Sequence, residues 1–348
     1  MDKHIKDRTL ENLDFIKSVL MVSVVLCHSA MFWGGGWFTT GVSPAVNDYV
    51  RGFSKWIQSF SVECFTLVSG YIFYYIRYEI FGYDNFLNFI KKKALRLLLP
   101  YLSVAMLWCI PIDLWFHFDV NTEFHKFVLG ESPAQLWFLL MLFWVFFFAY
   151  YITKLNGAFQ LLIVVSMFAI GAVAGAFMPN YFQITTAFIY ILFFWTGCMI
   201  RKKNVLTEDS KILMGGVIFL TINVALLFIS NRLQGDTLSQ KGVRFLLFEM
   251  SQYAGCLMAF CLLLWVSRKF NCANRFEWMS PLSFPIYLIH QQIIYIVLWC
   301  LTSTINPYLG TLVNFVIAVT MSSIFCQFLL RYKYTSLLLT GAYSVKKK

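Results

Sequence analysis

Three ionisable side chains lie within the first long apolar stretch of the chain. Lys17 and His28 are eleven residues apart, so a helix places both on one face, about 16 Å apart along its axis. Asp14 precedes Lys17 by three residues and can pair with it. A neutral imidazole can take a proton from a hydroxyl. The spacing predicts a cation near one membrane surface and a general base deeper inside; the alternative is that His28 only hydrogen-bonds a neighbouring helix.

Few other ionisable residues interrupt the apolar stretches, where a charge costs several kcal/mol and is retained for pairing or function. They are Glu63, Asp113, Glu249 and His290. His290 precedes two glutamines in a stretch that two prolines open. It either supports the chemistry or holds its own helix through a polar contact.

These residues must be positioned by membrane helices. The 348 residues are 59% hydrophobic and 13% charged, with a mean hydropathy of +0.67. A soluble domain carries about 25% charged residues, so lipid must cover the apolar excess. Ten stretches each approach the ~20 residues that a helix needs to cross a bilayer. We expect an all-α transmembrane bundle forming one domain, residues 1–348, with spans at 13–33, 56–76, 96–116, 136–153, 158–178, 183–200, 212–231, 247–266, 282–302 and 309–330.

The basic residues are distributed unevenly about these stretches. All but six of the 28 lysines and arginines lie at the two termini, in every second connection or, as Lys17, just inside the first stretch; the six are Arg51, Lys55, Lys126, Arg232, Lys241 and Arg244. This asymmetry follows the positive-inside rule and predicts that both termini are cytoplasmic. It accounts for the net charge of +11 without a basic domain, so no nucleic-acid partner is expected. The nine cysteines form no CxxC pair, so neither disulfides nor a metal site is expected.

Five segments, in order along the chain, resemble motifs of the acyltransferase 3 family. They are Leu13–Lys17 followed after ten residues by His28, Ser61–Tyr71, Lys91–Tyr101, Leu136–Leu139 and Ser283–His290. The family signature in the first helix is a basic residue, ten intervening positions and a histidine. Its basic residue is usually Arg, whereas Lys17 keeps the charge without the bidentate fork. Glu63 also departs from the family pattern.

The resemblance implies an integral membrane enzyme of the cell membrane, which is the inner membrane in a bacterium. Such an enzyme moves an acyl group, most often acetyl, from cytoplasmic acyl-CoA to a hydroxyl of an envelope or lipid-linked saccharide. Acyl-CoA is then a co-substrate, and no resident cofactor is expected. The resemblance assigns His28 as the catalytic base. The hydroxyl attacks the thioester directly, or the acyl group passes through an acylated side chain.

Two further groups of residues receive roles from the resemblance. The phosphates of acyl-CoA are expected to bind Lys17, Lys91, Lys92, Lys93 and Arg96. The three consecutive lysines also suit any cytoplasmic connection under the positive-inside rule. Supporting or channel-lining roles are expected for Asp14, Glu63, Ser69, Tyr71, Trp137 and His290. Glu63 would orient His28, bind the acceptor, or pair with a basic group such as Arg51 or Lys55.

Two other functions fit a polar stripe within a membrane bundle. A secondary transporter also places polar residues on interrupted helices near the midplane, but its repeated pair of broken helices is missing from this sequence. A non-catalytic membrane component of polysaccharide assembly would carry Lys17 and His28 without using them. Release of CoA in the presence of an acceptor separates the enzyme from both alternatives.

Overall fold

A computed structural model describes residues 3–35, 46–83, 85–116, 118–132, 134–233, 235, 237–272, 275–276, 278–301 and 305–343, with side chains from Asn12 onward. Every regular element in these ranges is helical, which confirms the predicted all-α bundle. The α-helices are α1 (Lys3–Met31), α2 (Asp48–Gln58), α3 (Ser61–Tyr74), α4 (Phe86–Val104), α5 (Ile110–Trp115), α6 (Val120–Val128), α7 (Trp137–Ile152), α8 (Gly157–Phe177), α9 (Ile184–Lys203), α10 (Asp209–Arg232), α11 (Leu238–Lys269), α12 (Ser280–Cys300), α13 (Pro307–Leu329) and α14 (Lys333–Thr340). Short π- and 3-10-helical turns, η1 (Tyr75–Glu79), η2 (Ala105–Cys109), η3 (Ala134–Leu136) and η4 (Tyr181–Gln183), join some of them.

Nine helical segments in the described ranges are long and apolar enough to cross a membrane. They correspond to nine of the ten predicted spans. The remaining span, 56–76, is divided between the end of α2 and the 14-residue helix α3, which is shorter than the ~20 residues that cross a hydrocarbon core. The π-helical turn η1 follows α3 directly and lengthens it by five residues.

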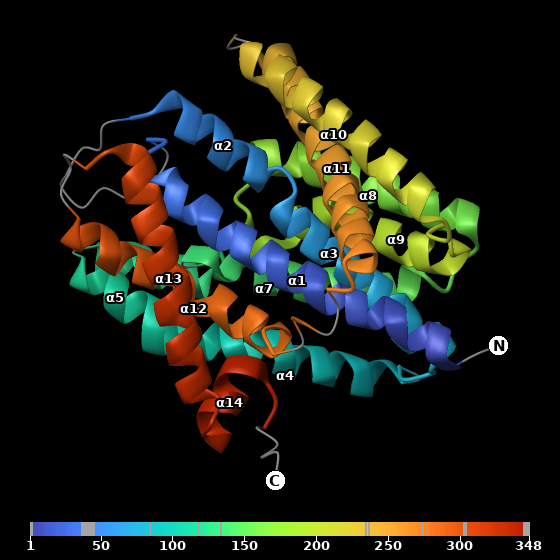
Figure 1. Cartoon of the computed structure of the whole chain (residues 1–348), viewed down its shortest axis with the longest axis horizontal. Coiled ribbons are helices and arrows are strands. Elements are labelled where there is room, and N and C mark those ends of the chain that lie inside the picture. The colour runs from blue at the N-terminus through green and yellow to red at the C-terminus, as the bar shows by residue number, and fades with distance from the viewer. Residues whose placement is uncertain are drawn as a thin grey trace.

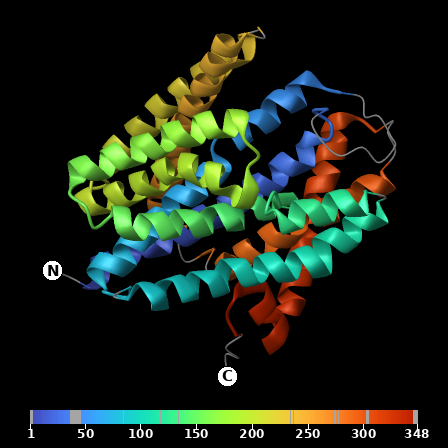
Figure 2. The ribbon, with the colours of Figure 1, turned by 180° about the vertical axis from the view of Figure 1, so that it is seen from behind.

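Helix α1 lies at the centre of the bundle. It contacts α2, α3, α11, α12 and α13, and Figure 1 shows it running between α11 on one side and α12 and α13 on the other. Seen from behind, α4, α7, α8 and α9 form the opposite face (Figure 2). α12 is the most enclosed span, with 83% of its apolar window buried against 22% for α8, α10 and α13. Polar side chains on α12 must therefore find partners inside the protein.

Glycine allows α3 and α9 to touch through their backbones. A Cβ at Gly70 would lie 1.9 Å from the Phe194 carbonyl oxygen, and one at Gly197 would lie 2.0 Å from the Leu67 carbonyl oxygen. Neither position tolerates a side chain, so the two glycines form a reciprocal small-residue contact. This contact brings the start of α3, with Glu63, beside Tyr190 of α9.

Prolines interrupt the hydrogen-bond pattern of α4 and α12, two of the helices that carry site residues. Pro100 lies inside α4, where its missing N–H leaves the Arg96 carbonyl without its usual helical donor. The π-helical turn η2 begins five residues later, so the regular α-helical pattern ends there. Pro285 lies inside α12 in the same way. Pro285 lines an internal cavity, and Pro100 follows Arg96 and Leu97, which line the same cavity.

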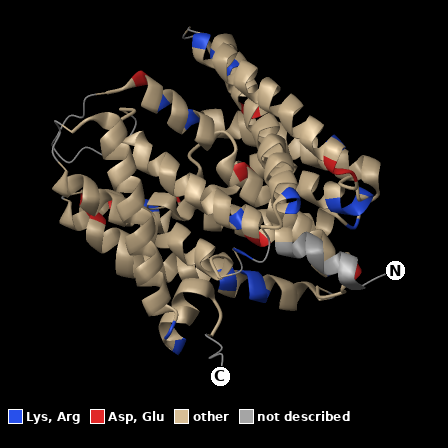
Figure 3. Cartoon of the chain, in the orientation of Figure 1, with Lys and Arg blue, Asp and Glu red and all other residues tan. Residues whose placement is uncertain are grey.

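Most lysine and arginine residues lie near the ends of the helices (Figure 3). The end of α11 lies beside the first third of α1, where the Ser267 hydroxyl donates a hydrogen bond of 2.7 Å to Asn12 Oδ1. At the opposite end of the bundle, Lys55 of α2 donates to Asn231 near the end of α10. These two contacts identify the opposite ends of the bundle. The charge asymmetry of the sequence predicts that the end with more lysine and arginine residues faces the cytoplasm, and this orientation stays a prediction.

Candidate active site

Two cavities lie inside the bundle, one on each side of a shared wall. One has a volume of about 470 Å³ and is lined by Lys17, Lys93 and Arg96 among mostly apolar side chains. We call it the cationic cavity. The other has a volume of about 400 Å³ and is lined by His28, Glu63 and several glutamines and tyrosines. We call it the histidine cavity.

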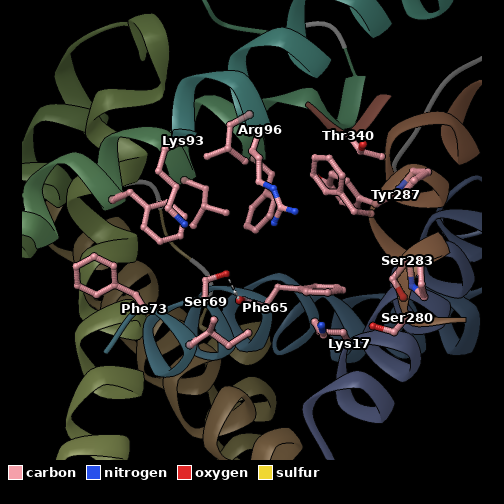
Figure 4. A pocket seen from close by; sticks show the side chains of 18 residues that line it. Lys17, Phe65, Ser69, Phe73, Lys93, Arg96, Ser280, Ser283, Tyr287 and Thr340 are labelled. Atoms are coloured by element: carbon pink, nitrogen blue, oxygen red, sulfur yellow. Dashed lines mark hydrogen bonds between the residues drawn. The ribbon is translucent and has the colours of Figure 1, made fainter. Parts of the chain in front are cut away.

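Two helices, α1 and α4, supply the cations of the first cavity. Figure 4 shows Lys93 and Arg96 reaching in from α4, with Lys17 of α1 on the facing wall. Lys17 Nζ lies 2.7 Å from Asp14 Oδ1, so the predicted pair within α1 is present. The Ser280 hydroxyl at the start of α12 donates to the same carboxylate oxygen over 2.7 Å. Asp14 therefore fixes Lys17 and ties α1 to α12.

The basic residues of α4 point to different sides of the helix. Lys93 and Arg96 are three residues apart and share a face, and both line the cationic cavity. Lys91 and Lys92 are exposed and line neither cavity. Lys93 is held by aromatic rings. Its Nζ lies 3.6 Å from the centroid of Phe146, within the range of a cation–π interaction, with Tyr83 and Phe89 farther away.

His28 and His290 meet at the edge of the second cavity. Nδ1 of His28 lies 2.8 Å from Nε2 of His290. The ring centroids are 4.9 Å apart with an interplanar angle of 16°. Because the centroids are farther apart than the nitrogens by about two ring radii, the rings meet edge to edge through an in-plane hydrogen bond. The two residues are 262 positions apart in sequence.

Hydrogen bonding to α12 decides which ring nitrogens carry protons. Nδ1 of His290 lies 2.8 Å from the Tyr287 carbonyl oxygen and 3.2 Å from that of Ile286. A carbonyl only accepts, so this Nδ1 carries the proton and Nε2 of the neutral ring is an acceptor. Nδ1 of His28 must then be the donor. Nε2 of His28 is consequently the basic nitrogen of that ring.

Glu63 joins three helices at the histidine cavity. It is 1% exposed, and its Oε1 accepts hydrogen bonds of 2.7 Å from both the Tyr190 hydroxyl and the Gln252 amide. Its Oε2 is buried and has no partner in the described part of the protein. The basic groups considered for Glu63 are engaged elsewhere. Arg51 pairs with Asp48 over 3.0 Å, and Lys55 donates to Asn231.

Amides and a hydroxyl complete the wall beside the two histidines. The Tyr287 hydroxyl donates to the Gln135 carbonyl oxygen over 2.6 Å, and Gln135 Nε2 donates to the Leu288 carbonyl oxygen. Gln291 Nε2 donates to the Tyr295 hydroxyl over 2.6 Å. The two bonds of Gln135 fix α12 against the segment 134–136 that precedes α7, whereas the bond between Gln291 and Tyr295 lies within α12. Trp137, half-buried at the start of α7, also lines this cavity.

The other expected supporting residues lie in different places. Ser69 lines the cationic cavity, and its hydroxyl donates to the Phe65 carbonyl oxygen over 2.9 Å. Tyr71 is buried and lines neither cavity; its hydroxyl accepts a hydrogen bond of 3.0 Å from Arg201. Sequence reasoning missed Tyr190, Gln252 and Tyr287. Their position inside apolar stretches was the signal that could have identified them. The chain has 18 tyrosines, so a tyrosine in such a stretch does not by itself indicate a site residue.

The family of the chain follows from a match that covers this whole arrangement. A family model described as an acyltransferase domain, that of acyltransferase 3, matches residues 10–331. The chain belongs to this family. The match extends from within α1 to the end of α13 and includes every cavity-lining residue except Thr340, which confirms the resemblance drawn from the motifs. No curated protein and no solved structure matches the chain.

The acyltransferase is thus a membrane protein with many apolar spans. Within it, the motif histidine of the first helix and that of the late helix motif are hydrogen-bonded partners. The motif lysine of the first helix lies in the other cavity. Helix α14 lies beyond the family match, yet its Thr340 lines the cationic cavity.

Proposed function

We propose that this acyltransferase moves a short acyl group, in the first place acetyl, from acyl-CoA in the cationic cavity to a hydroxyl of a saccharide or lipid-linked saccharide in the histidine cavity. The observation that carries the proposal is the pair of cavities that meet at Tyr287, with cations on one side and the histidine pair on the other. One cavity suits an anionic nucleotide and the other suits proton transfer.

The donor end is proposed for the cationic cavity. Lys93 and Arg96 form no ion pair with a described residue, whereas Lys17 is balanced by Asp14. The cavity therefore has an excess of positive charge that phosphate groups can neutralise. Its apolar remainder, which includes Phe65, Phe138 and Phe284, suits the thioester arm of the donor. By the charge asymmetry this end faces the cytoplasm, where acyl-CoA is made.

The acceptor end is proposed for the histidine cavity. Glu63, Gln252 and Gln291 offer hydrogen-bonding groups there, and the half-buried Trp137 offers an aromatic face. This combination suits a sugar, which presents hydroxyls at its edge and C–H groups on its face. Glu63 departs from the family pattern, so it is a feature with which this chain would distinguish its own acceptor.

In the proposed chemistry, Nε2 of His28 takes the proton of the acceptor hydroxyl as its oxygen attacks the thioester carbonyl. A C–O bond forms, the C–S bond breaks, and the proton passes from His28 to the departing thiolate. Nδ1 of His28 keeps its hydrogen bond to His290 in the neutral and the charged ring. His290 is therefore a positioning residue, like the third member of a catalytic triad.

Purified protein in proteoliposomes tests this function. Acetyl-CoA is supplied on one side and a panel of 4-nitrophenyl glycosides on the other, and CoA release and labelled glycoside are measured. We expect CoA release that depends on a glycoside and yields one acetyl ester per CoA. Flux of the glycoside without CoA release would support the transporter instead. Neither ester nor flux, from protein that binds acetyl-CoA, would support the non-catalytic component.

A further inference from the structure

The wall between the two cavities consists of aromatic rings. Tyr287 is the one described residue that lines both cavities, and it is 6% exposed. Neighbouring residues divide across the same wall. On α7, Trp137 lines the histidine cavity and Phe138 lines the cationic cavity. On α3, Glu63 lines the histidine cavity and Phe65 lines the cationic cavity. The boundary therefore crosses three helices at one level.

The rings at this level contact one another. The centroids of Phe138 and Tyr287 are 5.6 Å apart at 66°, and those of Phe65 and Phe138 are 6.5 Å apart at 57°. Both pairs are within the range of favourable tilted and edge-to-face contacts. Tyr287 also lies 5.9 Å from the ring of His290. The aromatic wall thus ends on the histidine pair.

We propose that Phe65, Phe138 and Tyr287 form a septum that contacts the acyl chain of the donor, limits its length and keeps water from the thioester. The inference rests on the proposed function, because it assumes a donor in the cationic cavity and a base at His28. Transfer requires the thioester carbonyl to reach the hydroxyl beside His28, and the septum separates that point from the nucleotide end. The thioester must then lie between these rings, with the acyl carbons packed against them.

The septum predicts a preference for a short acyl group. Phe138 is 7% exposed and Tyr287 is anchored through its hydroxyl to the Gln135 carbonyl oxygen, so neither ring can withdraw without cost. A close-packed wall accepts a methyl group more readily than a longer chain. The same packing excludes water, which would otherwise attack the thioester and release a free carboxylic acid and CoA.

Side-chain substitutions can separate the septum from the catalytic pair. The Tyr287 group that holds His290 is its backbone carbonyl, which remains in any variant at this position. Tyr287→Leu therefore removes the ring without removing this hydrogen bond. Tyr287→Phe removes only the hydroxyl and retains the ring.

The test measures kcat/KM of each variant with acetyl-, butanoyl- and hexanoyl-CoA, together with CoA release in the absence of any glycoside. We expect Phe65→Ala, Phe138→Ala and Tyr287→Leu each to raise the ratio for butanoyl over acetyl by about tenfold, since one or two methylenes decide such pockets. We also expect them to raise glycoside-independent CoA release. Tyr287→Phe keeps the ring but loses its anchor to Gln135, so it should raise the ratio less than Tyr287→Leu does.

Phe148→Ala is the matched control. Phe148 lies on α7 like Phe138, is half-buried against Phe188, and lines neither cavity. Its variant should keep the wild-type chain-length ratio and the wild-type CoA release without glycoside.

The outcomes separate this proposal from the function on which it rests. If the wild type transfers no acyl group, the proposed function fails. If the wild type transfers acetyl and every folded septum variant keeps its chain-length ratio, the septum proposal fails alone. Because the septum is tested at three positions, the result does not depend on any single variant being able to fold.

Discussion

The two cavities of the acyltransferase differ in how far apart in the sequence their key residues lie. The cationic cavity has charges on side chains that are three residues apart in one helix, as with Lys93 and Arg96 or Asp14 and Lys17. The histidine cavity depends on bonds between distant segments, such as His28 with His290 and Glu63 with Gln252. Binding of an anion needs positive charge within reach, whereas proton transfer needs atoms placed within tenths of an ångström. The difference predicts that changes in the two cavities affect different kinetic constants.

The largest effect is expected for His28→Ala. Loss of the general base should lower kcat by roughly 10²- to 10⁴-fold with little change in the KM for acetyl-CoA, because the donor binds in the other cavity. Labelled ester formed in proteoliposomes measures it. His125→Ala is the control, since His125 is exposed on α6 and lines neither cavity. Unchanged transfer by folded His28→Ala would remove the base from the mechanism.

A smaller effect is expected for His290→Ala. A hydrogen bond to a group that becomes charged contributes about 1.5–3 kcal/mol, so its loss should lower kcat by roughly 10- to 100-fold. His290→Asn offers an oxygen that accepts from His28 and an amide that donates to α12, and should recover part of the rate. Equal rates for the two variants would show that His290 only packs the helix.

The donor side should show the reverse kinetic pattern. Lys93→Gln and Arg96→Gln should each raise the KM for acetyl-CoA about tenfold and leave kcat nearly unchanged. A tenfold change is what the loss of one hydrogen bond to a charged group is expected to cause. Added salt should weaken the effect. Lys92→Gln is the matched control, because Lys92 is an exposed neighbour outside the cavity. A fall in kcat without a rise in KM would contradict the division between the cavities.

The smallest effect is expected for Glu63→Gln. The amide oxygen can still accept from Tyr190 and Gln252, so the melting temperature should stay within a few degrees of wild type. If Glu63 binds the acceptor, the KM for the glycoside should rise about tenfold while that for acetyl-CoA stays constant. Glu249→Gln, which changes a neighbouring carboxyl outside the cavity lining, is the control. An unchanged glycoside KM would exclude this role of Glu63.

Local patterns predicted most of the helices and part of the cationic cavity. Hydropathy located the spans because the bilayer imposes a length on each helix, and the pairing of Asp14 with Lys17 followed from a separation of three residues. The basic run, which lies within α4, was predicted as one group. Only Lys93 and Arg96 line the cavity, because a helix turns successive residues to different sides.

The sequence by itself determined that this chain is an all-α membrane protein and that His28 and His290 belong to recognisable motifs. The tertiary structure decided that these two imidazoles share a hydrogen bond and that Tyr287 divides one cavity from the other. The physical reason is the range of the forces. Hydropathy and charge act along each segment, whereas a hydrogen bond between residues 28 and 290 depends on how α1 and α12 pack, which no local pattern encodes.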